Sequence, residues 1–260
     1  MKSVQNLADG WKQGREAAWN LLFPPCCPLC QNRLAHPHRL CDACHRGLPP
    51  RPDGLCIRCG FESGGAPFCP RCHDREKKHP DLYLAAFAYE GGMEKLLVGL
   101  KFGDRTHWAD LVADLCWERL ESTLRWEEPE WVVPTPLHPL RLIQRRYNQA
   151  ALLAGALSRR LGVPLETNAL QRVRWTPPQT RLGAAARLRN LEGAFAVRGD
   201  LFRGRGVLLV DDVATTGATL SAAAMALRQG GAARVTALCV ARTLSDRERR
   251  ETPASDHSPP

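Results

Sequence analysis

No stretch of the 260-residue sequence approaches the about 20 uninterrupted apolar residues that a membrane-spanning helix requires. The first residues also lack the apolar core of a secretory signal. The Gly-Lys-Ser/Thr ending of the loop that holds the terminal phosphates of ATP is missing as well. These absences argue against an integral membrane protein, an exported protein and a P-loop nucleotidase. We expect a cytoplasmic protein with no transmembrane segment.

Acidic residues are in the minority, because 36 Lys and Arg outnumber 27 Asp and Glu and give a formal net charge of +9. Such a charge favours anionic partners, namely nucleic acid, acidic lipid or phosphorylated metabolites, and a solvated basic face is the alternative explanation. Residues 1–24 predict an imperfect amphipathic helix, which either docks on the protein or lies on a membrane surface. Five arginines crowd one part of the second half: Arg172, Arg174, Arg181, Arg187 and Arg189.

Cysteine, in contrast, is abundant near the N-terminus. Two thiolates separated by two residues can hold one tetrahedral ion, and a second pair shortly afterwards completes four sulfur ligands. Sequential pairing of the motifs predicts two structural Zn²⁺ ions, whereas cross-braced pairing and a disulfide framework are the alternatives. Eight of the eleven cysteines form four Cys-x-x-Cys pairs: Cys27/Cys30, Cys41/Cys44, Cys56/Cys59 and Cys69/Cys72.

Zinc bound by four thiolates has no open coordination position, so these ions should be structural. Residues 25–78 contain too few large apolar residues for a core, and metal binding would therefore supply the folding energy there. We predict a double zinc ribbon over this range, with Cys26 as a spare thiol or as a substitute for Cys27.

The stretch VLLVDDVATTGAT at 207–219 combines a short apolar strand, two acids and a turn that opens a helix. Asp211 and Asp212 leave the predicted strand 207–210, where both carboxylates could turn toward a sugar diol. Backbone N–H groups of the turn could hold a phosphate at the positive end of the helix. The turn residues are Ala214, Thr215, Thr216, Gly217, Ala218 and Thr219.

Strands and helices alternate along the rest of the chain. We predict strands over 82–89, 131–136, around 165–173 and over 235–242, and helices over 93–102, over 108–124 and from Asn148 onward. This order predicts a doubly wound parallel α/β sheet over 79–245, with its ligand at the carboxyl ends of the strands, and a disordered tail over 246–260.

Basic residues near that edge are candidate ligand contacts. Lys101 ends one predicted helix, and a plain surface lysine is the alternative. Arg145 follows the strand 131–136 together with Arg141 and Arg146. A planar guanidinium suits the oxygens of a pyrophosphate. Residues 174–190 have little periodicity and predict either a functional lid or a disordered loop, and Gln179, Arg181 and Arg187 would be the ligand-facing residues of a lid.

The stretch 207–219 resembles the loop of type I phosphoribosyltransferases that binds phosphoribosyl pyrophosphate (PRPP). The resemblance implies that Asp211 and Asp212 are catalytic residues that bind the ribose hydroxyls, that the turn binds the 5′-phosphate, and that PRPP binds with Mg²⁺. In that family a small hood would place Lys101 over the site.

Taken whole, the chain resembles the ComF (GntX-like) family, which joins a double zinc ribbon to a type I phosphoribosyltransferase-like domain. The resemblance implies a role in natural transformation or in DNA uptake and utilisation at the cytoplasmic face of the inner membrane. It also implies single-stranded DNA and the DNA-uptake or helicase machinery as partners. A non-catalytic DNA-binding module or a PRPP sensor that uses the same pocket is the alternative function. Where the family has Arg-Gly-Phe-Asn-Gln, Arg146 replaces the glycine, either in the same backbone conformation or in a different turn.

Overall fold

A computed structural model of the chain describes residues 24–61, 63–73, 79–103, 105–174, 191 and 193–243. The predictions for helix 1–24, lid 174–190 and tail 246–260 fall wholly or almost wholly outside these ranges. The chain divides into two compact units, Met1–Leu48 and Pro49–Pro260. The first pair of Cys-x-x-Cys motifs belongs to the first unit, and the second pair shares a unit with the α/β part.

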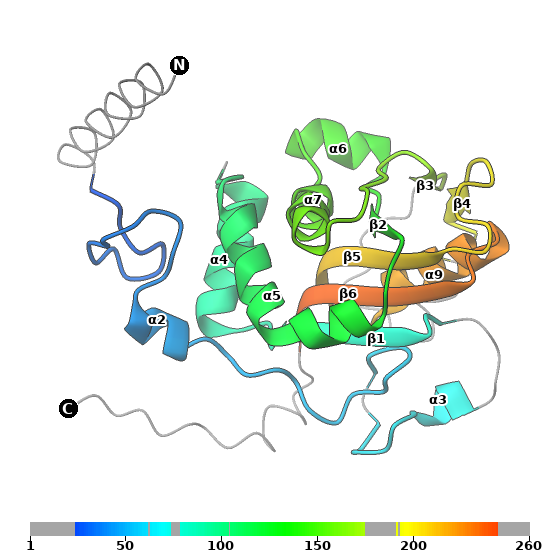
Figure 1. Ribbon diagram of the computed structural model, residues 1–260, viewed down its shortest axis with the longest axis horizontal. Helices are drawn as coiled ribbons and strands as arrows, with labels where there is room; N and C mark the ends of the chain where they lie inside the picture. The colour runs from blue at the N-terminus through cyan, green and yellow to red at the C-terminus, as the bar shows by residue number, and fades with distance from the viewer. Residues whose placement is uncertain are drawn as a thin grey trace, which may run out of the picture. The chain divides into compact units, whose positions relative to one another are not determined.

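The second unit is built on a four-stranded parallel sheet in the order β1-β6-β5-β2 (Figure 1). The sequence predicted all four strands, although their exact bounds differ. Val207 of β5 pairs with Trp131 of β2 on one side and with Val235 of β6 on the other, and these pairs define the register of the three strands. The strands are β1 (Leu82–Ala88), β2 (Trp131–Pro134), β5 (Gly206–Ala214) and β6 (Arg234–Arg242).

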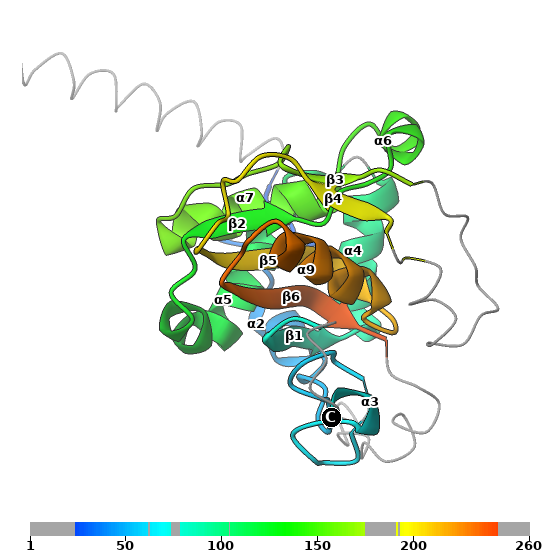
Figure 2. The same ribbon diagram turned by 90° about the vertical axis from the view of Figure 1, so that its right-hand side faces the viewer.

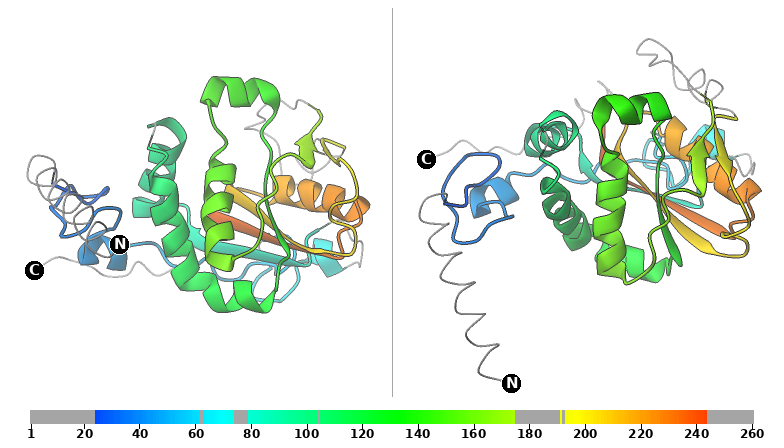
Figure 3. Two further views of the ribbon diagram at one scale, coloured as in Figure 1. Left: turned by 45° about the horizontal axis from the view of Figure 1, so that its top comes forward. Right: turned by 90° about the horizontal axis from the view of Figure 1, so that it is seen from above.

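Helices cover both faces of this sheet. Buried residues of α9 (Ala218–Gln229) form a core cluster with one face of β1, β5 and β6. Figure 2 shows α9 in front of these strands, and the right-hand view of Figure 3 shows it across the sheet from α7. The helices of the other face are α4 (Gly91–Phe102), α5 (Trp108–Trp126) and α7 (Gln149–Leu161). None of the helices among the described residues is both long and apolar enough to cross a membrane.

The predicted strand around 165–173 is wrong for most of its length. Leu165 makes only an isolated bridge to Val132, and the Glu166 carboxylate then accepts hydrogen bonds from the next backbone N–H groups, which turns the chain away from the sheet. β3 begins at Leu170 (Leu170–Arg172) and pairs antiparallel with β4 (Phe195–Val197) in a separate two-stranded sheet. The central sheet therefore has one strand fewer than the sequence predicted.

The short helix α6 (Pro139–Arg145) was not predicted, because the prolines before it favour a loop. Proline suits the first position of a helix, where no backbone N–H is needed. α6 carries the predicted ligand arginines 141 and 145, and α7 then begins after Asn148, whose side chain accepts a hydrogen bond from the N–H of Ala150 at 3.0 Å.

The edge strand β1 is covered by the segment that carries the second pair of cysteine motifs. The N–H of Tyr83 donates to the Ile57 carbonyl at 2.5 Å, and the N–H of Ala88 donates to Pro50 at 2.9 Å. Arg119 of α5 donates to the carbonyls of both Pro49 and Ala86, so it joins this segment to the sheet. An exposed strand edge is an open template for other chains, and this cover removes it.

Candidate functional site

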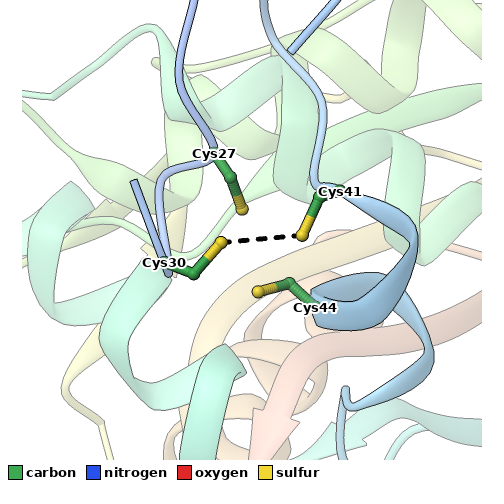
Figure 4. Close-up of side chains that lie close together, drawn as sticks. All are labelled: Cys27, Cys30, Cys41 and Cys44. Atoms are coloured by element: carbon green, nitrogen blue, oxygen red, sulfur yellow. Dashed lines mark hydrogen bonds between the residues drawn. The ribbon is translucent and has the colours of Figure 1, made fainter. Parts of the chain in front are cut away.

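The first cysteine tetrad lies in the unit 1–48 and joins two consecutive motifs. The Sγ atoms of Cys27, Cys30, Cys41 and Cys44 all lie within 4.8 Å of one another (Figure 4). Cys30 and Cys41 are 3.6 Å apart at sulfur. Cys41 precedes the short helix α2 (Asp42–Arg46), which carries Cys44. Cys26 stands outside the tetrad, and its thiol donates to the Pro24 carbonyl.

The second tetrad lies in the unit 49–260 and also joins two consecutive motifs. Its members, Cys56, Cys59, Cys69 and Cys72, are all buried, and their Sγ atoms fall within 4.8 Å of one another. Cys59 and Cys69 are 3.6 Å apart at sulfur. The first three of the four precede the short helix α3 (Pro70–His73), which carries Cys72.

Both tetrads fit a tetrahedral zinc ion. Zn–S bonds of about 2.3 Å place neighbouring sulfurs about 3.8 Å apart, close to the observed 3.6 Å. A disulfide needs about 2.05 Å, and all eleven cysteines, each within the described residues, are free thiols. The disulfide alternative and cross-braced pairing are therefore both contradicted. Two four-thiolate donor sets are those of structural zinc.

One thiol of each tetrad ionises easily. Burial acts to raise the pKa of Cys27, but backbone N–H groups, above all that of Cys41, outweigh it and lower this pKa to about 6. The same balance of burial and backbone N–H groups lowers the pKa of Cys56 to about 7. Since the thiolate is the form that binds metal, these two thiols can make the first bond to a cation near neutral pH. Burial raises the pKa of Cys44, Cys59 and Cys72, so these thiols lose their protons only as the metal binds.

Metal analysis tests the two sites directly. We expect close to two zinc ions per chain, because each tetrad offers four thiolates to one ion. The double substitution Cys27→Ser/Cys30→Ser should reduce the content to about one. A wild-type protein that holds about one zinc would contradict two independent sites.

The turn at 215–217 leads from β5 into α9 and shapes a small pocket. Gly217 is the N-cap of α9 with φ 71°, and as a glycine it has no side chain that could cap the helix. The first turn of α9 contains no acidic residue, so its N–H groups face no carboxylate of their own helix. The pocket measures about 50 Å³, several times the ~10–15 Å³ that one water needs. It is lined by Asp211, Val213, Ala214, Thr215, Thr216, Gly217, Ala218, Thr219 and Leu220.

The two acids do not leave the strand together, contrary to the prediction. β5 continues to Ala214, which pairs with Arg242, so Asp211 and Asp212 both lie within the ladder. Neighbouring residues of a strand point to opposite faces. Asp211 accordingly lines the pocket, whereas a carboxylate oxygen of Asp212 forms an ion pair with Lys101 Nζ at 2.9 Å.

The pocket acid has an unusual proton affinity. Burial, followed by the neighbouring charge of Asp212, raises the pKa of the Asp211 carboxyl well above its ordinary value of 3.8. Two groups act in the opposite direction, namely the backbone N–H of Asp212, which donates to Asp211 at 3.0 Å, and the more distant charge of Lys101. Such a shift is typical of acids in functional sites.

Three arginines of α6 and β3 lie close enough for their charges to influence one another. Burial and then the charge of Arg145 lower the pKa of Arg141, and burial and then the charge of Arg141 lower the pKa of Arg172. The charge of Asp211 acts on the pKa of Arg172 in the opposite direction, and the Arg172 guanidinium itself lies 5.5 Å from the centroid of the Phe195 ring. The predicted ligand residues Arg181 and Arg187, and Gln179 with them, lie outside the described residues.

One feature of this region escaped the sequence interpretation. Phe102, the last residue of α4, is 71% exposed, and the Arg145 guanidinium lies 5.6 Å from its ring centroid. The only signal in the sequence was that this phenylalanine follows Lys101 at the end of a predicted helix. An aromatic ring thus lies between the Arg145 guanidinium and, as its neighbour in the chain, Lys101, which pairs with Asp212.

Arg146 occupies the position where the ComF resemblance expected glycine. Its φ of 64° shows that it adopts the left-handed conformation, and its side chain is exposed. A non-glycine residue there costs about 1–2 kcal/mol. We expect Arg146→Gly to stabilise the protein by about 0.5–1 kcal/mol in urea unfolding, once the greater freedom of glycine in the unfolded chain is subtracted.

Arg145→Gly is the control for this substitution. Arg145 ends α6, where glycine is unfavourable by about 1 kcal/mol, so the unfolding free energy should fall. Two substitutions that changed stability in the same direction would contradict the strain at Arg146.

Comparison with known proteins agrees with both parts of the chain. A double zinc ribbon domain matches residues 18–73, and a phosphoribosyl transferase domain matches residues 148–258. An orotate phosphoribosyltransferase structure from Aeropyrum pernix matches with 23% identity and a TM-score of 0.34 over 73% of this chain and 78% of its own.

Two curated relatives match most of the chain. DNA utilization protein YhgH of Escherichia coli K12 is 35% identical over 231 residues, which cover 86% of this chain and all of the relative. Competence protein F of Haemophilus influenzae is 35% identical over 199 residues, which cover 74% of this chain and 85% of the relative. The chain therefore belongs to the ComF family of competence and DNA utilization proteins.

Proposed function

We propose that the pocket after β5 binds a phosphoribosyl ligand such as PRPP, and that the protein uses it in DNA uptake and utilisation. The observation that supports this proposal is a small pocket lined both by Asp211 and by the start of α9, whose N-cap is a glycine. The helix N–H groups and threonine hydroxyls suit a 5′-phosphate, and Asp211 suits a sugar hydroxyl. The part in DNA metabolism is inferred from the names of the relatives.

In this proposal Lys101 and Asp212, on the other face of β5, contact the part of the ligand that extends beyond the pocket. Their side chains are only 18% and 13% exposed, so the ion pair is well protected from solvent. A ligand hydroxyl can accept from Lys101 and donate to Asp212 without separating the two charges. Mg²⁺ bound with PRPP would supply positive charge to the pyrophosphate, and Arg141 and Arg145 of α6 would bind its remaining oxygens.

As an enzyme, the protein would transfer the phosphoribosyl group to an acceptor and release pyrophosphate. The arginines stabilise the charge that develops on the leaving pyrophosphate. Asp212, or a water that it orients, takes a proton from the acceptor.

Pyrophosphate release from PRPP, measured across nucleobase and amine acceptors, tests this function. We expect turnover that Asp211→Ala and Asp212→Ala reduce at least about 100-fold, because each removes a carboxyl group that contacts the substrate in this proposal. Asp200→Ala, at an exposed position outside the pocket, is the matched control and should retain activity. Failure of the wild-type protein to bind PRPP or ribose 5-phosphate would reject the proposal.

A single-stranded DNA-binding module is the second candidate, and Phe102 favours it. An exposed ring with a guanidinium beside it offers a stacking surface for a base, and the nearby arginines suit phosphates. Tyr147, another aromatic of this region, instead donates its hydroxyl to the Leu100 carbonyl at 2.7 Å. A DNA-binding module requires no catalysis. This candidate function would therefore remain if no acceptor substrate for the phosphoribosyl group were found.

DNA affinity measured at several salt concentrations tests this module. Phe102→Ala should weaken binding about tenfold, in keeping with the ~1–3 kcal/mol that stacking of one base contributes. The control is Trp126→Ala, which removes an even more exposed ring at the end of α5, before the start of β2. Binding that does not weaken as salt is raised would contradict phosphate contacts.

A further inference from the structure

The knuckle Cys56–Gly60 of the second tetrad lies directly against the turn that starts α9. A Cβ atom at Gly217 would overlap the carbonyl oxygen of Cys59. The φ of Gly217, 71°, also belongs to the region that favours glycine. The backbone of a metal ligand and the backbone of the sugar-phosphate turn are therefore in contact, with no side chain between them.

Tyr83 of β1 lies against the same knuckle and also close to Gly217. A Cβ at Gly60 would overlap the Tyr83 ring, and the Tyr83 N–H donates to Ile57 inside the knuckle. The Tyr83 ring is buried, and its hydroxyl lies 3.0 Å from the sulfur of Cys239. Cys239 is the residue of β6 that pairs with Asp211, so the contacts lead back to the pocket acid.

Two more contacts connect this ribbon with α9. His79, which follows the second tetrad in the chain, has its Nδ1 2.9 Å from Ser221 Oγ in the first turn of α9. Leu55 packs against the core cluster that contains Ala214 and Ala218, at the two ends of the turn. The ribbon thus contacts the turn, the first helical residues and the neighbouring strand.

We propose that the second tetrad positions the sugar-phosphate turn, so that zinc at Cys56, Cys59, Cys69 and Cys72 and ligand in the pocket stabilise each other. Four thiolates on one ion fix the path of the knuckle, and the Cys59 carbonyl then fixes Gly217. Release of the metal frees the knuckle and removes this support. Binding linkage is reciprocal, so a bound ligand must retain the metal by the same factor.

This inference rests on the proposed function, and the first measurement separates the two. Ribose 5-phosphate is titrated into the wild-type protein with both zinc ions bound. Absence of binding would overturn the proposed function and this inference with it. Binding that is indifferent to the second zinc would overturn the inference alone.

Zinc release from the wild-type protein is the decisive measurement. A chelator removes the metal, and a metallochromic dye follows its release with and without saturating ribose 5-phosphate. At equilibrium with the chelator we expect the ligand to tighten the binding of one zinc by about tenfold, within the range of ordinary site-to-site coupling, and to leave the other unchanged. Equal protection of both ions, or of neither, would overturn the proposal.

Matched cysteine variants assign the protected ion. Cys27→Ser/Cys30→Ser removes the first site, in the other compact unit, and should keep both ligand affinity and the protected zinc. Cys56→Ser/Cys59→Ser should weaken ribose 5-phosphate binding about tenfold while circular dichroism still reports the α/β fold. If this second variant does not fold, zinc release from the wild type and from the first variant is sufficient to assign the protected ion. Loss of protection in the first variant would contradict the assignment.

Discussion

Asp211→Asn is expected to make the protein more stable and, at the same time, to weaken its binding of ribose 5-phosphate by about 10–100-fold. Burial and the charge of Asp212 disfavour the ionised Asp211 carboxylate, and Asn removes that penalty. The gain should be about 1–2 kcal/mol at neutral pH, or roughly 2–8 °C in melting temperature for a unit of this size. Affinity falls because an amide NH₂ replaces one carboxyl oxygen that would bond the sugar hydroxyl.

The stability advantage of Asp211→Asn over the wild type should increase with pH. The native state of the wild-type protein holds the Asp211 proton more tightly than the unfolded state, so stability is greatest below the unfolded pKa and falls as the pH rises toward the raised native pKa. The advantage of the Asn variant should therefore be small near about pH 4 and grow toward neutrality. A constant difference across this range would contradict the raised pKa.

Asp212→Asn serves as the matched control. It removes the partner of Lys101, whose ammonium group is largely buried, so stability should fall by about 1–3 kcal/mol. Opposite signs for two adjacent acids would reflect their opposite faces of β5, and melting curves at neutral pH measure both.

Gly217→Ala should produce the largest loss of stability. Its φ of 71° costs a non-glycine residue about 1–2 kcal/mol. The new Cβ must also push the turn away from the Cys59 carbonyl, which adds about 1–3 kcal/mol of overpacking. We expect a total of about 2–5 kcal/mol in urea unfolding, together with loss of phosphate binding.

Gly199→Ala separates the two contributions. Gly199 has nearly the same φ, 74°, but a Cβ there would meet no atom within 4 Å. This variant should lose only the about 1–2 kcal/mol of the conformational term. Equal losses at both positions would show that the Cys59 contact contributes nothing.

Local features of the sequence predicted much of this structure. Each cysteine tetrad gathers two motifs that are near neighbours in the chain, and spacing alone indicated them. The helices α4, α5 and α7 and the four central strands follow from apolar periodicity within short windows. The start of α7 could also be predicted, because asparagine, here Asn148, is a common N-cap residue.

Features that depend on distant pairing could not be predicted in the same way. Whether Asp211 and Asp212 lie in a strand or at its exit depends on how far β6 extends beside them, and the Ala214–Arg242 pair decides it. β3 finds its partner only after a long intervening segment. The approach of Cys59 to Gly217 joins two glycine-containing turns from distant parts of the chain, and no periodicity marks it.

The position of β6 between β1 and β5 determines when the pocket can form during translation. β1 and β5 share no hydrogen bonds of their own, since both pair with β6, which is synthesised after them. The nascent chain can load metal into its cysteine tetrads early, but the sheet closes only after Arg242 has left the ribosome. A premature stop before Arg234 would therefore release a metal-bound chain that has no ligand pocket.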